Sequence, residues 1–147
     1  MKTPALSSIE QTVFTLANEQ YETLLTTIRS AEYQSLEHGE VEQFVHQEGT
    51  ELLRRLFQGH LDLRAANEVQ YQNLVGSDRQ TRPHHRQNTH RQLETLFGEV
   101  VVTRVGYSTK TPGVSALYPA DGILNLATDS TQTDGYRCLC IQHPSLC

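Results

Sequence analysis

The chain has 147 residues, of which 37% are hydrophobic and 20% are charged, with a formal net charge of −5. These values fit one modest domain whose core is small or shared with a partner. No run of about 18 apolar residues exists and the N-terminus lacks the apolar stretch of a signal peptide, so we expect a cytoplasmic protein without a membrane span.

The first helical pattern begins at Ser7, which has the capping-box spacing with Glu10. Apolar residues then recur at spacings of three, four and seven, which predicts an amphipathic helix to about residue 34. These positions are Ile9, Val13, Leu16, Ala17, Leu24 and Ile28. We expect the helix to end before the segment 36–39, where Gly39 marks a boundary.

A second helical pattern covers residues 40–67, and a short connection predicts that the two helices pack as an antiparallel hairpin. Its stripe consists of Val41, Phe44, Val45, Leu52, Leu56 and Leu63. The apolar stripes are wider than one helical hairpin can cover. We therefore assign residues 1–68 to a helical region and expect a partner surface, either the rest of the chain or another copy.

The pattern changes from residue 69. Residues 73–88 are polar and predict a long loop, and two β-prone stretches around a turn at Phe97-Gly98 predict a β-hairpin. One register of this hairpin sets Arg91 opposite Arg104. The predicted fold class is α+β: a helical hairpin, a β-hairpin module over residues 69–127, and an irregular tail over residues 128–147.

Charge is unevenly distributed. Residues 1–70 carry 5 basic and 11 acidic side chains, whereas residues 79–110 carry 6 basic and 2 acidic ones. Arginine clusters attract polyanions through phosphate contacts and counterion release. The candidate DNA-binding residues are Arg79, Arg82, Arg86, Arg91 and Arg104. Two facing arginines need an anion between them, and a DNA phosphate would serve; the alternative is that they lie in water or pair with Glu94 and Glu99.

All three cysteines lie in the tail, where a disulfide scaffold would have spread them through the fold. Together with a histidine they form a set of four potential zinc ligands: Cys138, Cys140, His143 and Cys147. Their close spacing is unusual for a structural site, so the main expectation is no bound cofactor and a tail of incidental thiols. A small zinc-binding protein is the third function considered.

Several of these segments together resemble insertion-sequence transposases of the ISKra type. The helical part of the resemblance is residues 48–56 (EGTELLRRL) and 60–64 (HLDLR). The hairpin part is Arg91, Leu93, Thr95, Phe97, Gly98, Glu99, Val100, Val102, Arg104 and Tyr107, continued by Tyr118, Pro119, Asp121, Leu124 and Leu126. The similarity covers roughly residues 40–127, and after Ala127 the composition changes abruptly, which suggests a tail translated out of frame.

The resemblance implies an N-terminal, non-catalytic portion of a transposase that contributes DNA binding or subunit contacts. Family members cut and join DNA in a later domain, where carboxylates hold two divalent metals. We expect this chain to stop before that domain, so it is not an enzyme by itself and has no catalytic residues. Its expected partners are DNA, in the context of an intact transposase, and a further copy of itself through self-association. The alternative is a small helical interaction protein with no nucleic-acid role.

Overall fold

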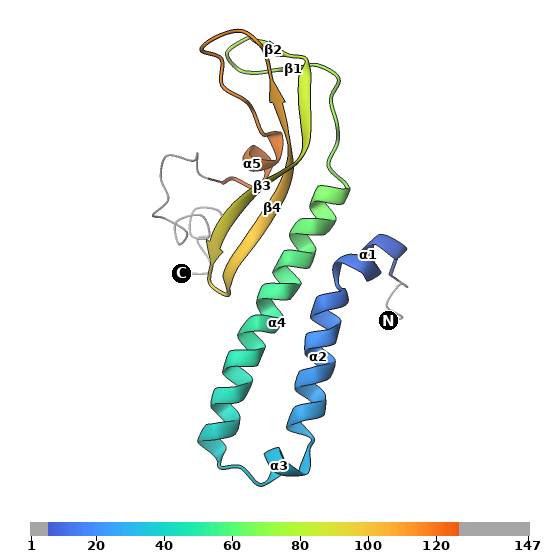
Figure 1. Cartoon of the computed structure of the whole chain (residues 1–147), viewed down its shortest axis with the longest axis vertical. Coiled ribbons are helices and arrows are strands. Elements are labelled where there is room, and N and C mark those ends of the chain that lie inside the picture. Colours follow the sequence, from blue (N-terminus) through green and yellow to red (C-terminus); the bar gives the residue numbers. More distant parts are fainter. Residues whose placement is uncertain (1–5, 127–147) are drawn as a thin grey trace, which may run out of the picture. The chain divides into compact units, whose positions relative to one another are not determined.

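Helices and antiparallel strands follow one another along residues 6–126, the part of the chain that the computed structural model describes (Figure 1). The predicted α+β class is confirmed. The chain divides into two units: the first contains the helices through Ala66 together with Leu96–Val100, and the second contains Asn67–Thr95 and the chain from Val101 onward.

The predicted capping box is present at the start of α1 (Ser8–Val13). The Glu10 amide donates to Ser7 Oγ (3.3 Å), and the Ser7 amide donates to Glu10 Oε2 (2.7 Å). These two bonds hold amide groups that the first turn of a helix cannot satisfy internally. The Ser7 amide lowers the pKa of Glu10, and the Ser7 side chain adds to the same shift.

The expected single helix to residue 34 is wrong, because the chain bends twice. Phe14 ends α1 with φ −100° and ψ 6°, and α2 (Thr15–Ile28) follows. Ser30 then caps α3 (Ala31–Gln34) by accepting from the Tyr33 amide. Apolar periodicity continues through both bends, which is why the pattern alone did not locate them.

The second predicted helix is α4 (His38–Ala66), which runs antiparallel to α2 in the first unit (Figure 1). Polar bonds tie the pair: Gln20 Nε2 donates to Glu48 Oε2 (2.6 Å), and Arg55 Nη1 donates to the Leu16 carbonyl (3.1 Å). Gly39 lies in the first turn of α4, near the helix boundary expected there.

The turn of the β-hairpin belongs to the first unit. Val100 is buried there, Leu61 of α4 is buried as well, and Arg54 Nη1 of α4 reaches the Glu99 carbonyl at 3.4 Å. The apolar surface of α4 is therefore divided between α2 and residues Leu96–Val100. Several large apolar side chains of both long helices nevertheless stay exposed, as the width of the stripes led us to expect.

In the second unit, the expected loop over residues 73–88 is partly strand. The short strands β1 (Leu74–Val75) and β2 (Thr81–Arg82) pair antiparallel, with Leu74 opposite Arg82. The strand β3 (His84–Thr95) then begins within the polar segment and pairs with β4 (Gly98–Ser108). The polar composition misled the prediction because this part of β3 is solvent-exposed on both faces.

The predicted β-hairpin is confirmed, but its register differs. The turn residues are Leu96 and Phe97, and Gly98 has a φ of +117° that side chains disfavour. Thr89 Oγ1 donates to the Arg104 carbonyl (2.7 Å), and the side chains of His90 and Thr103 meet at 3.1 Å. Thr89, and not Arg91, is thus the cross-strand neighbour of Arg104.

After β4 the chain returns along that strand. Tyr107 and Leu117 exchange backbone hydrogen bonds of 2.8 and 2.9 Å, and the short helix α5 (Pro119–Ile123) follows. Across residues 6–126, none of the helices is both long and apolar enough to cross a bilayer. The four predicted zinc ligands and the irregular tail lie outside the described residues.

Candidate nucleic-acid interface

Arg82 is a structural residue of the second unit. Its guanidinium is 1% exposed and donates to Asp78 Oδ2 (2.7 Å), Asp78 Oδ1 (3.1 Å), the Gln80 carbonyl (3.1 Å) and the Ser115 carbonyl (2.9 Å). A buried guanidinium with this many partners is held by the fold. It joins the turn between β1 and β2 to the segment that follows β4.

The carboxylate that pairs with Arg82 is strongly stabilised in its charged form. Hydrogen bonds from Arg82, and next from the Gln80 amide, lower the pKa of Asp78 from 3.8 to about 2. The pair therefore stays charged throughout the neutral and mildly acidic range. It fixes the turn that carries Arg79.

Arg91 and Arg104 converge on one internal carboxylate. Nη1 of Arg91 lies 3.1 Å from Asp121 Oδ2, and Nη1 of Arg104 contacts the same oxygen. Arg104 is 5% exposed, and Asp121 comes from α5. Asp121 of the chain itself thus supplies an anion beside both arginines, where the sequence predicted a DNA phosphate or pairing with Glu94 and Glu99.

Tyr118 stacks on the guanidinium of Arg104. The Arg104 guanidinium carbon lies 3.9 Å from the centre of the Tyr118 ring, which is cation–π geometry. Gly106 lets the ring approach, because a Cβ at this position would lie 2.7 Å from a Tyr118 ring carbon. Arg104 is thus enclosed by a carboxylate, an aromatic ring and a strand.

Glu68 is a second carboxylate near this cluster. Its Oε2 accepts from the Val105 amide (3.1 Å), while its Oε1 is buried and has no hydrogen-bond partner within the described residues. Burial raises the pKa of Glu68, and the Val105 amide and the charge of Arg104 oppose that shift only in part. The folded chain therefore disfavours the charged form of Glu68.

Substitution of Glu68 by glutamine is expected to stabilise the second unit slightly at pH 7. Glutamine keeps an acceptor for Val105 but has no charge to desolvate. Because the folded pKa is raised, wild-type stability improves as the pH falls through that pKa toward the ordinary value of 4.5. The advantage of the variant should shrink over the same range. Amide hydrogen exchange of β4 at pH 7 and near pH 4.5 measures the stability difference between the variant and the wild type. A variant less stable than the wild type at pH 7 would contradict a disfavoured charge at Glu68.

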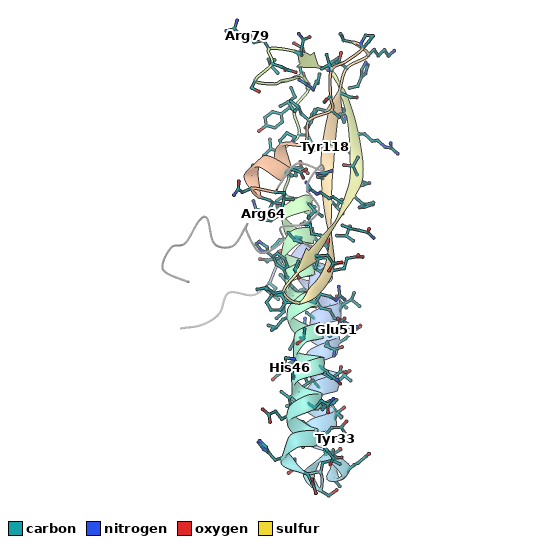
Figure 2. All side chains as sticks on the ribbon, turned by 90° about the vertical axis from the view of Figure 1, so that its left-hand side faces the viewer. Tyr33, His46, Glu51, Arg64, Arg79 and Tyr118 are labelled. Atoms are coloured by element: carbon teal, nitrogen blue, oxygen red, sulfur yellow. The ribbon has the colours of Figure 1, made fainter. Side chains whose placement is uncertain are left out.

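The other predicted DNA-binding residues, Arg79 and Arg86, are exposed. Arg79 lies in the turn between β1 and β2, where its side chain points away from the unit (Figure 2), and Arg86 lies near the start of β3. Lys110, just after the end of β4, is also exposed. No ion pair of these three side chains is found within residues 6–126. All three belong to the end of the β3–β4 hairpin away from its turn.

The backbone at Arg79 is unusual for its residue type. Its φ is 59°, in the left-handed region that glycine and asparagine occupy at lower cost. The Arg79 amide donates to the Gly76 carbonyl (3.0 Å), and the Gln80 amide donates to Asp78 Oδ1 (3.0 Å), so the turn is well fixed. An arginine at a position that favours glycine points to a use for its side chain.

The structure therefore separates the five predicted arginines into two groups. Arg82, Arg91 and Arg104 are buried or half-buried and bonded to carboxylates, whereas Arg79 and Arg86 face solvent. Reasoning from the sequence did not assign roles to Tyr118 and Asp121, although both belong to the segment quoted for the resemblance. The sequence feature that could have identified Asp121 was the placement of Arg91 and Arg104 on paired strands, because two such arginines need a nearby anion.

The acidic side chains of α4 do not assemble into a site within the described residues. Glu48 bonds Gln20, Glu51 bonds Arg54 and Arg55, and Asp62 bonds Gln58. The two arginines lower the pKa of Glu51 to about 2. No group of three or more potential metal ligands occurs among residues 6–126.

Comparison of the chain with protein-family models, with curated proteins and with solved structures found no match.

Proposed function

We propose that the chain is a non-catalytic portion of an insertion-sequence transposase and that it contributes DNA binding or subunit contacts to transposition. In this proposal the second unit contacts DNA through Arg79 and Arg86, with Lys110 beside them. Arg82, Arg91 and Arg104 hold the unit in shape and touch no phosphate.

The main support for the DNA contact is the net charge that remains on the surface of the second unit after its internal ion pairs are taken into account. The described part of the second unit holds six basic and four acidic residues. Asp78 and Asp121 pair with buried or half-buried arginines, and Glu68 is directed at Val105. Asp78 is exposed but paired with Arg82, so Glu94 is the one exposed carboxylate of the described second unit that pairs with none of these arginines, and the surface carries a positive excess.

The resemblance gains support from where its residues lie. Four positions quoted for it, Arg91, Arg104, Tyr118 and Asp121, meet in one cluster although 30 residues separate the first from the last. A pattern that describes a packed cluster is a better indicator of a shared module than scattered matches are. The DNA contact then lies on residues outside that cluster.

Fluorescence anisotropy with a labelled duplex tests the proposal. The full chain should bind with an affinity that falls steeply as salt rises, since each phosphate contact adds about 0.9 to the slope of log affinity against log salt. Changing both Arg79 and Arg86 to glutamine should reduce that slope by about 2 and weaken binding to all sequences alike. The control is Arg29→Gln, an exposed arginine of the first unit. A flat salt response contradicts the DNA role.

A second candidate function is a helical interaction protein with no nucleic-acid role. The observation that favours it is the set of large apolar side chains left exposed on the helices of the first unit: Leu16, Tyr21, Val45, Leu53 and Leu56. Association without DNA binding would select this alternative. Salt-dependent DNA binding would select the transposase portion.

A further inference from the structure

An apolar stripe on α4 has no covering element among the described residues. Val45, Leu53 and Leu56 are 39, 46 and 43% exposed, and their spacing of eight and three places them on one side of the helix. Gly49 lies on the same side, four residues from both Val45 and Leu53, and nothing lies within 4 Å of the position its Cβ would take. The stripe therefore contains a hollow next to protruding leucines.

This stripe is distinct from the surface that packs on α2. The α2 side of α4 is identified by Glu48, Arg55 and Gly59, which contact Gln20, Leu16 and Phe14. At 100° per residue, the mean direction of those three positions lies about a quarter turn from the stripe. A second helix could pack on the stripe without displacing α2.

We propose that a second copy of the chain covers this stripe, with the two α4 helices antiparallel about an axis between Leu52 and Leu53. Gly49 and Leu56 lie equally far from that point, so Leu56 of each copy would face the hollow at Gly49 of the other. A protruding side chain opposite a hollow is the requirement of close helix packing. Two such contacts form, one on each side of the axis.

Charge selects the antiparallel arrangement. Glu42 and Arg64 are exposed and border the stripe near its two ends, with the Glu42 side chain 74% exposed. Figure 2 shows Arg64 far along α4 from His46, which lies one turn beyond Glu42. In antiparallel helices, Glu42 of one copy lies beside Arg64 of the other, twice over. Parallel helices would instead place like charges together.

Sedimentation equilibrium of the full chain without DNA tests the inference. We expect a dimer that dissociates on dilution. Leu56→Asp should raise the dissociation constant by at least about tenfold, since each tenfold step needs only the loss of one well-packed apolar contact. Leu16→Asp, on α2 and 60% exposed, is the matched control and should leave the constant unchanged.

Charge reversal tests the orientation without touching the apolar stripe. Glu42→Arg and Arg64→Glu should each weaken the dimer, and the two changes together in one chain should restore it. A protein that is monomeric at all concentrations, or a dimer that is insensitive to Leu56→Asp, overturns the inference. So does a double reversal that recovers nothing.

The α4 dimer is the subunit contact of the proposed function and rests on that proposal. Dimer formation and DNA binding can nevertheless be measured independently of each other. The monomeric Leu56→Asp chain should still show a salt-dependent affinity through Arg79 and Arg86, at lower apparent strength because one site and not two engages the duplex. Loss of the dimer with retained DNA binding leaves the transposase proposal standing. Loss of DNA binding with a retained dimer contradicts that proposal and leaves the α4 contact.

Discussion

Replacing Asp121 with alanine is expected to destabilise the second unit by roughly 3 kcal/mol, the lower end of the range for breaking a buried ion pair. The Asp121 carboxylate is 18% exposed and contacts both Arg91 and Arg104. Its removal leaves two guanidinium groups near each other, one of them almost fully buried. The cost arises more from two partly buried charges that lose the carboxylate they share than from the lost bonds themselves.

Amide hydrogen exchange of β3 and β4 is the suitable measurement for Asp121→Ala, because far-UV circular dichroism is dominated by the helices of the first unit. Protection of both strands should fall, while that of α4 stays unchanged. The matched control is Glu94→Ala, an exposed carboxylate on β3, for which a change within about 0.5 kcal/mol is expected. Unchanged strand protection in Asp121→Ala would show that the shared carboxylate is dispensable.

Substitution of Gly59 by alanine is expected to destabilise the first unit by about 1–2 kcal/mol. The new Cβ would lie 2.6 Å from a ring carbon of Phe14 and 2.8 Å from the Val13 carbonyl oxygen. The ring can shift, but the backbone oxygen is held at the end of α1. Overpacking of this kind costs about 1–3 kcal/mol, and the better helix propensity of alanine offsets at most about 1 kcal/mol of it.

Gly39→Ala provides the comparison, because Gly39 also lies in α4 and nothing lies within 4 Å of its Cβ position. It should be neutral or slightly stabilising. Urea unfolding followed at the helical circular-dichroism band distinguishes the two variants. Equal midpoints for both would mean that α4 does not approach the bend at Phe14 as closely as the structure indicates.

Most of the helical part followed from the sequence because burial there repeats with the period of the helix. The capping box at Ser7 and the extent of α4 needed only local signals. The bend at Phe14 was not predicted in this way, and the Phe14 ring packs close to Gly59, which is 45 residues away in the chain. The spacing of apolar residues along a helix does not predict long-range packing of this kind.

The β-hairpin was predictable for the same local reasons, but its register was not. Pairing depends on whether the turn is centred on Leu96-Phe97 or on Phe97-Gly98, and a shift of one residue changes which side chains face each other. That difference moved Arg91 away from the position opposite Arg104. The two side chains still share one face of the hairpin, and so both reach Asp121.

The roles of the arginines in the candidate site also depend on contacts that local sequence patterns do not predict. Composition identified a basic segment correctly, but it could not separate arginines that hold the fold from those that face solvent. That separation depends on Asp78 and Asp121, whose partners lie four residues away in one case and 17 to 30 in the other. Of the five predicted arginines, Arg79 and Arg86 are the two that face solvent.

In this division Arg79 and Arg86 serve the duplex and Asp121 serves the fold, and one paired measurement distinguishes the two roles. Salt-dependent duplex binding and strand protection are compared between the Arg79→Gln, Arg86→Gln double variant and Asp121→Ala. We expect the double variant to lower the salt slope by about 2 with strand protection unchanged, and Asp121→Ala to lower strand protection. A double variant that binds the duplex with the wild-type slope would contradict this division.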